Sequence, residues 1–232
     1  MRNFIDTLHE SNLLGKIFPT LLSNLKEELK DCETVLDLGC GPSSPLQYCK
    51  NIKKSVGVEP FKPYISESKK KKIHTRYLQK KIEDLDFPAK SFDAVIMIEV
   101  LEHLAKQNGM KILKSMEKWS KRKIIVTTPN GFLEQKELDN NVRQKHLSGW
   151  KINELEKFGF SIRGLAGLKF LRKERIHNTE EANLLSSIRY QPKLFWFIIA
   201  AISQIFAYRF PQYAFELFAV KKLNVEESNR NI

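Results

Sequence analysis

Short apolar runs alternate with amphipathic segments along most of the chain. The apolar runs predict strands at 34–38, 55–58, 75–79, 92–98, 123–128, 161–167 and 213–223. Helical spacing of apolar residues predicts helices between them, at 63–72, 101–119 and 151–158. Apolar strands that alternate with helices indicate a parallel sheet covered on both faces. Such a sheet binds its ligand at the carboxyl ends of its strands.

The ends of the chain depart from this alternation. Leucines at helical spacing predict an N-terminal helical segment at 1–30, which leaves 31–223 for the main domain. Within that domain we expect an apolar helical insertion at about 172–210, built around the strongly apolar stretch 194–208. Residues 224–232 are expected to form a polar tail.

A glycine-bearing turn and a distant acid suggest a ribose-containing ligand. Asp37, Gly39 and Gly41 lie where the first strand enters its turn, and Glu59 ends the second strand 20 residues after Gly39. A carboxylate there can hold both hydroxyls of a ribose. A dinucleotide and S-adenosylmethionine both fit this plan. The third glycine of the dinucleotide pattern falls at Ser44, however, and Asp37 would repel a pyrophosphate but attract an ammonium group.

A cluster of carboxylates and histidines follows the fourth strand. Glu99, Glu102 and His103 would share one face at the start of a helix, because residues three and four apart lie side by side. Together they can hold a divalent cation such as Mg²⁺, with His146 as a fourth ligand. Acids near a helix start are also favoured by the helix dipole, so the cluster alone leaves a structural role open. Without a metal, His103 or His146 is the predicted general base.

Five motifs in order give the chain a specific likeness. They are VLDLGCG (35–41), VGVEP (56–60), IEDLDFPAKSFDAVIMIEVLEHL (82–104), TTPN (127–130) and HLSGW (146–150). Over residues 33–171 the sequence resembles the class I S-adenosylmethionine-dependent methyltransferases. The resemblance implies an α/β fold: a Rossmann-like, mostly parallel seven-stranded sheet with helices on both faces and an antiparallel last strand.

The resemblance also implies a cofactor site. Its members are the methionine-binding turn, the ribose-binding acid with the proline after it, the adenine pocket, and the residues that close the site after the fourth strand: Asp37, Gly39, Cys40, Gly41, Glu59, Pro60, Ile82, Glu83, Ile98 and Glu99. One departure is visible. Many relatives carry an aspartate just before the position of Ile82, whereas this chain has Lys81 there. Lysine accepts no hydrogen bond, so Glu83 or a backbone carbonyl is expected to bind the adenine amino group.

The EVLEH segment (99–103) narrows the expected reaction. It resembles the ubiquinone-pathway O-methyltransferases, and a similar segment with a later histidine occurs in methyltransferases that act on the terminal 2′-hydroxyl of small RNAs. In both groups the implied metal binds vicinal oxygens of the acceptor. We therefore expect O-methylation of a small, lipid-like acceptor, with RNA ribose 2′-O-methylation as the alternative enzyme and a non-catalytic binding module as the least favoured interpretation.

The net charge and the apolar stretch 194–208 indicate less about the function than the motifs do. Of the net charge of +12, residues 50–81 supply +9, because they hold 11 Lys and Arg against two acids. This patch could dock on a membrane or a nucleic acid, but nucleic acid is not the favoured partner. The stretch 194–208 is too short for a bilayer of roughly 30 Å and predicts a buried or lid helix, with peripheral membrane contact as the alternative. Three cysteines without zinc spacing favour a cytoplasmic protein.

Overall fold

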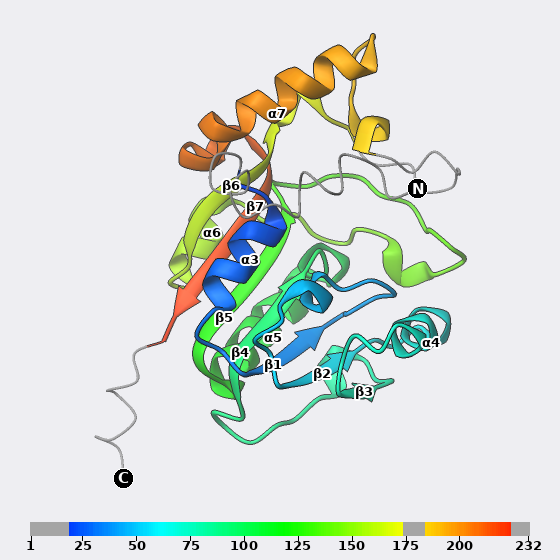
Figure 1. The fold of residues 1–232 in the computed structure, drawn as a ribbon, viewed down its shortest axis with the longest axis vertical. Coiled ribbons are helices and arrows are strands. Elements are labelled where there is room, and N and C mark those ends of the chain that lie inside the picture. The colour runs from blue at the N-terminus through cyan, green and yellow to red at the C-terminus, as the bar shows by residue number, and fades with distance from the viewer. Residues whose placement is uncertain (1–18, 174–183, 224–232) are drawn as a thin grey trace.

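The chain forms one seven-stranded sheet with helices on both faces (Figure 1). The structure, a computed structural model, describes residues 19–173 and 184–223. Its strands are β1 (Thr34–Leu38), β2 (Lys54–Val58), β3 (Arg76–Leu78), β4 (Phe92–Ile98), β5 (Ser120–Pro129), β6 (Ser161–Leu168) and β7 (Ala214–Lys222). Its α-helices are α3 (Leu21–Leu29), α4 (Lys62–Lys70), α5 (Lys106–Trp119), α6 (Ile152–Lys157) and α7 (Lys193–Arg209).

The strands lie in the order β3-β2-β1-β4-β5-β7-β6. β1 pairs in parallel with both β2 and β4, and β4 pairs in parallel with β5. β7 runs antiparallel to both of its neighbours, β5 and β6. The predicted fold class is therefore confirmed. Because the strand order reverses at β1, the chain segments that follow β1 and β4 diverge and leave a crevice at their carboxyl ends.

Each face of the sheet has its own hydrophobic core. Along β1, Val35 faces the core that holds Leu25 and Leu29 of α3, whereas Leu36 faces the core that holds α5 and α6. Successive strand residues point to opposite faces, so burial on both sides requires the continuous apolar runs seen in the sequence.

Only residues 19–30 of the predicted N-terminal helical segment lie within the described part of the chain. α3 begins after Thr20, whose side chain accepts a hydrogen bond from the Ser23 amide while Ser23 Oγ accepts one from the Thr20 amide. This reciprocal capping satisfies amides that a helix start leaves free. The rest of the predicted segment, residues 1–18, and the predicted tail, 224–232, lie outside the described residues.

The helix predicted at 101–119 is divided in two. Leu101–His103 form a single 3₁₀ turn, and α5 begins only at Lys106. The chain leaves β4 through a left-handed residue, Glu99 (φ +54°), and then packs Val100 against Gly39. The α-helix therefore starts after the chain has passed the turn that follows β1.

Small and polar side chains attach α7 to β6. Ala200 and Ala207 are fully buried, and the Gln204 side chain donates to the Gly164 carbonyl (3.0 Å) and accepts from the Gly167 amide (2.7 Å). A Cβ at Gly164 would overlap the carbonyl of Ala207, so the glycine permits this close approach. Six large apolar side chains of α7 are 46–61% exposed: Leu194, Phe195, Ile198, Ile202, Ile205 and Phe206. Trp196, Phe197 and Ile199 instead pack against the small core of Leu171, Ile188 and Ala200.

Across the described residues, no helix combines the length and the hydropathy that a bilayer crossing needs. The exposed apolar face of α7 belongs to a helix of 17 residues that lies along the end of the sheet (Figure 1).

Candidate functional site

A cavity of about 750 Å³ opens at the carboxyl ends of β1, β2 and β4. All ten residues predicted to bind the cofactor line it: Asp37, Gly39, Cys40, Gly41, Glu59, Pro60, Ile82, Glu83, Ile98 and Glu99. The segment after β5 lines the cavity as well, through Leu138, Asp139, Asn141, Val142, Arg143, Gln144 and Leu147. The sequence predictions thus fall in one place.

The turn after β1 requires its two glycines for different reasons. Gly39 (φ +69°) lies against Val100, and a Cβ at this position would approach Val100 Cγ2 to 2.5 Å. Gly41 (φ +55°) has no protein atom within 4 Å of where its Cβ would lie. Both have backbone conformations that side chains disfavour. The missing side chain at Gly39 allows Val100 to pack against the turn, whereas the missing side chain at Gly41 leaves the space beside the turn open.

Asp37 is buried at the base of the cavity. It is 2% exposed, and its Oδ2 accepts a hydrogen bond of 2.5 Å from the Ser44 hydroxyl. Burial raises the pKa of Asp37 to about 7, an effect that the Ser44 hydrogen bond opposes and the nearby Glu59 charge reinforces. A cationic group placed beside Asp37 would favour its charged form.

Glu59 closes the turn from the end of β2. Its carboxylate accepts from the Gly41 amide (3.2 Å) and the Phe61 amide (2.9 Å), which fixes its orientation. Burial raises the pKa of Glu59, and the two backbone hydrogen bonds act in the opposite direction. Each carboxylate oxygen has a second lone-pair direction, so Glu59 can still accept from a pair of hydroxyls.

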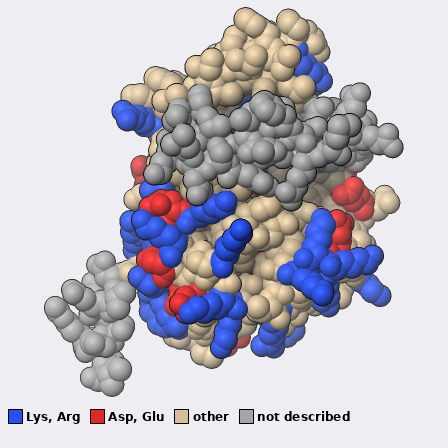
Figure 2. Space-filling view, viewed as in Figure 1, with Lys and Arg blue, Asp and Glu red and all other residues tan. Residues whose placement is uncertain are grey.

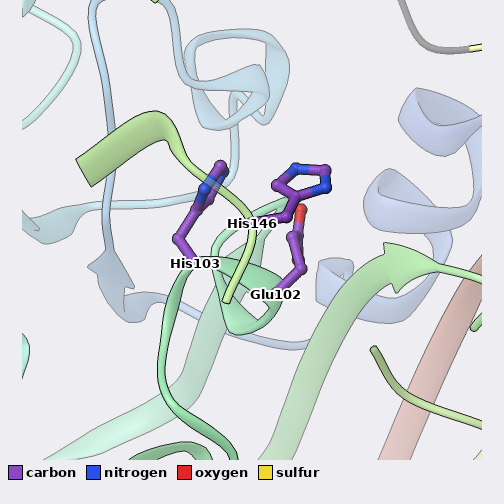
Figure 3. A group of neighbouring side chains, drawn as sticks. All are labelled: Glu102, His103 and His146. Atoms are coloured by element: carbon purple, nitrogen blue, oxygen red, sulfur yellow. The ribbon is translucent and has the colours of Figure 1, made fainter. Parts of the chain in front are cut away.

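Glu102, His103 and His146 form a compact cluster beside this cavity (Figure 3). One potential ligand atom from each residue lies within 4.8 Å of the others. Glu102 and His103 come from the 3₁₀ turn after β4, and His146 comes from the segment after β5. The two imidazole rings have centroids 4.7 Å apart, and His103 also lines the cavity.

Backbone carbonyls orient the two imidazoles. His146 Nδ1 lies 2.6 Å from the Leu133 carbonyl oxygen, and His103 Nδ1 lies 3.2 Å from the Lys145 carbonyl oxygen. Because a carbonyl only accepts, Nδ1 carries the proton in both rings. Each Nε2 then keeps a lone pair, which is the arrangement of a histidine metal ligand or a general base.

Burial controls the charges of the cluster. It lowers the pKa of His103 to about 4, with the neighbouring His146 as a second cause, and it also lowers the pKa of His146. Burial raises the pKa of Glu102 well above its usual value, and the Glu99 charge adds to this. The Glu102 Oε2 atom is buried without a hydrogen-bond partner among the described residues. A buried acid beside two neutral imidazoles suits a cation.

Glu99 occupies a different position from the other three predicted metal ligands. It is not in the group of close ligand atoms, and its Oε1 accepts a hydrogen bond of 2.8 Å from the Thr127 hydroxyl. Its left-handed backbone turns it away from the helix start that the sequence suggested. Glu99 therefore lines the cofactor cavity, while Glu102, His103 and His146 form the candidate metal site.

Sequence reasoning missed several residues of this site. Ser44 bonds Asp37, and Arg143 provides a positive charge facing Glu59. Tyr64 of α4 donates a hydrogen bond of 2.5 Å to Asp139, which ties the segment after β5 to the far side of the cavity. The two residues are 75 positions apart, so no local pattern could have revealed the contact.

Comparisons with known proteins agree with this geometry. Residues 36–125 match a family model described as a methyltransferase domain. No curated protein matches the chain. A similar solved structure is a SAM-dependent methyltransferase from Archaeoglobus fulgidus, 17% identical with a TM-score of 0.52, the match covering 91% of this chain and 98% of that one.

Two further solved structures have the same fold. The plantazolicin methyltransferase BpumL, in complex with a triazolic desmethylPZN analog and SAH, is 14% identical with a TM-score of 0.52, covering 94% of this chain and 91% of its own. The methyltransferase domain of bacterial CtHen1 is 19% identical with a TM-score of 0.50, covering 87% and 97%. At such identities the likeness shows the fold. The family match adds that residues 36–125 have the sequence of a methyltransferase domain, a match over less than half of the chain.

The packing of the β1 turn predicts a specific double-mutant result. Gly39→Ala should weaken S-adenosylmethionine binding and lower the stability by about 1–3 kcal/mol, since the new Cβ meets Val100 and the backbone is left-handed. Adding Val100→Ala should restore part of the loss. Calorimetric binding and urea unfolding of the single and double variants measure this coupling. Additive losses would show that the Val100 contact is irrelevant.

Proposed function

We propose that this methyltransferase transfers the methyl group of S-adenosylmethionine to a hydroxyl oxygen of a small, apolar acceptor. One observation carries the proposal: the cluster of Glu102, His103 and His146 lies beside the cavity that all the predicted cofactor residues line. A hydroxyl needs help to lose its proton before it attacks a methyl group, and this cluster supplies suitable groups for that task.

Different residues of the cavity would bind different parts of the cofactor. Asp37 would attract the ammonium of the methionine end, and Glu59 would accept from the ribose hydroxyls. Ile82 is 5% exposed and lines the cavity, where its apolar side chain would pack against an adenine ring. Lys81 also lines the cavity, so the acceptor for the adenine amino group remains Glu83 or a backbone carbonyl.

The cluster fits a divalent cation. Two neutral imidazoles with free Nε2 lone pairs and one buried carboxyl match the donor set that such ions take. When bound, a divalent cation lowers the pKa of an acceptor hydroxyl and orients its oxygen. Without a cation, the free Nε2 lone pair of His103 or His146 would accept the hydroxyl proton instead. As the new O–C bond forms in line with the breaking S–C bond, the S–C electrons pass to sulfur and neutralise its charge.

The cavity mouth favours an apolar acceptor. Val142 and Leu147 line the cavity and are 66% and 56% exposed, so they present apolar surface to an entering molecule. The basic side chains of residues 50–81 are all exposed, and most lie on or beside β2, α4 and the β3 edge of the sheet; Lys81 also lines the cavity. An RNA methyltransferase, the alternative, would need such cations around the cavity mouth, where the RNA chain continues beyond the methylated nucleotide.

Labelled products distinguish these acceptors. Incubating the protein and methyl-labelled S-adenosylmethionine with cell extract should give label in an organic-soluble ether, at a rate reduced at least about a hundred-fold in Glu102→Gln. The exposed acid Glu117, which pairs with Lys221 at 2.7 Å, provides the control Glu117→Gln. Label that is confined to ribonuclease-sensitive material would contradict the proposal.

Metal binding can be measured without turnover. Titration with Mn²⁺ should show one site, and Glu102→Gln or His146→Ala should each weaken it at least ~10-fold, whereas Glu117→Gln should not. The affinity should rise from pH 6 to pH 8. The raised pKa of Glu102 means that a bound proton must leave before the cation binds, and fewer protons are bound as the pH increases. Equal Mn²⁺ binding by all four proteins would remove the metal from the proposal.

We also propose that α7 contacts a membrane surface. The helix places Ala200, Gln204 and Ala207 against the protein and six large apolar residues outward, the reverse of the pattern on an ordinary surface helix. Lys193 and Arg209 stand at its two ends, as cations do on helices that lie on anionic lipid. Figure 2 shows the α7 region almost free of charged atoms, while Lys and Arg gather lower on the body.

A charge-matched pair of variants tests this contact. Ile198→Glu with Ile202→Glu changes the net charge by two, as Lys70→Glu does in the basic segment. The intact protein should sediment with phosphatidylglycerol vesicles, the double variant should lose at least about nine-tenths of that binding, and Lys70→Glu should retain most of it. Binding lost in Lys70→Glu but kept in the double variant would assign the contact to the basic patch instead.

A further inference from the structure

A buried histidine lies directly behind the cofactor turn. His74 precedes β3, its side chain is fully buried, and its Nε2 is 3.5 Å from Asp37 Oδ2. Neither ring nitrogen has a hydrogen-bond partner among the described residues. A buried polar group without a partner is costly, so an imidazole left in this state calls for an explanation.

The surrounding fold is built to admit this ring. Gly57 of β2 stands opposite Asp37 in the β1–β2 ladder, and a Cβ at Gly57 would overlap the His74 ring. The edge of the ring packs against Tyr77, with centroids 5.3 Å apart and planes at 81°. Tyr77 Oη accepts from the His74 amide (2.9 Å) and donates to the Ser68 carbonyl (2.8 Å). These contacts aim the imidazole past Gly57 at Asp37.

The charge states of the two side chains suit a hydrogen bond in which neutral His74 donates and Asp37 accepts. Such a bond would stabilise the ionised form of Asp37, which burial disfavours. Burial lowers the pKa of His74 to about 4, so the ring is neutral near pH 7. Burial raises the pKa of Asp37 to about 7, with the charge of Glu59 acting in the same direction. The other titratable groups around the pair are Cys40 and Cys49, which burial keeps as thiols, and Tyr77 on the far side of the ring. Among the described residues, Ser44 alone donates a hydrogen bond to the Asp37 side chain.

We propose that His74 is a positioning residue that donates a hydrogen bond from Nε2 to Asp37 and holds its carboxylate toward the ammonium group of S-adenosylmethionine. This inference rests on the placement of the methionine end at Asp37 proposed above. Closing the 3.5 Å separation by a few tenths of an ångström would form the bond. A neutral donor also leaves the cofactor ammonium as the only cation beside Asp37.

A matched pair of variants separates this role from simple packing. His74→Gln keeps an amide N–H at similar reach, whereas His74→Met has the same length without a donor. His74→Met should weaken S-adenosylmethionine binding about ten-fold, the scale of a hydrogen bond to a charged group, while His74→Gln stays within about three-fold of the parent. Binding of 5′-methylthioadenosine, which lacks the amino acid end, should change little in either variant.

The pH dependence provides a second readout. Removing the donor raises the pKa of Asp37 in the free protein, so in His74→Met the loss of S-adenosylmethionine binding on acidification should begin at a higher pH. Equal binding by His74→Gln and His74→Met at every pH would overturn the proposal. Equal losses for S-adenosylmethionine and 5′-methylthioadenosine would overturn it as well, because they would show only a packing role.

Two controls distinguish failure of the inference from failure of the cofactor placement. Asp37→Asn should lose S-adenosylmethionine affinity; unchanged affinity would overturn the placement and the inference together. In ¹⁵N-labelled parent protein, the His74 ring should be the neutral Nε2–H tautomer between pH 6 and pH 8 with S-adenosylmethionine bound. The Nδ1–H tautomer would overturn the role of His74 alone, even if a variant failed to fold.

Discussion

β1 pairs with β2 on one side and with β4 on the other, and the site depends on this central position. Asp37 is opposite Gly57 of β2 and Ile96 of β4, so the ends of three strands lie side by side. The strand order reverses at this point, which keeps the following segments from covering the strand ends. Asp37 at the end of β1, Glu59 after β2 and His103 after β4 are brought to one cavity by this pairing, whereas His146 reaches the cluster beside it from the segment after β5.

Burial gives this cavity an unusual electrostatic character. It raises the pKa values of Asp37, Glu59 and Glu102 and lowers those of His74 and His103. The basic excess of the chain does little to counter this, because the cations of residues 50–81 are all exposed and solvent screens their charges. The site therefore gains most from positive charge that arrives with its ligands. In the function proposed above, a cofactor ammonium beside Asp37 and a divalent cation beside Glu102 would provide it.

The sequence predicts the repeating parts of the structure better than the contacts between them. The central strands have continuous apolar patterns, and the predicted cofactor residues follow strand ends and line one cavity, so both could be located in advance. The helix predicted at 101–119 was wrong at its start, because Val100 has to pack on Gly39 before α5 can begin. Glu99 is separated from the metal cluster for the same reason. Helical spacing contains no information about such a tertiary constraint.

His74 and α7 show what a periodic pattern cannot reveal. A glycine within a strand indicates a close approach, as at Gly57, but the approaching ring of His74 comes from the segment before β3, 17 residues later. The apolar composition of 194–208 indicated a helix correctly, yet it could not show that Gln204 faces inward and Ile202 outward. That orientation depends on the glycines of β6, which lie about 40 residues earlier in the chain.

The central claim is that one cavity holds the methyl donor beside a metal-assisted acceptor site. An anomalous difference map of crystals grown with SAH and Mn²⁺, recorded at the manganese edge, tests it most directly. The account predicts one strong peak within coordination distance of Glu102, His103 and His146, next to SAH that lies between Asp37 and Glu59. Clear density for SAH in that position with no manganese peak at the cluster, or SAH bound elsewhere, would contradict the account.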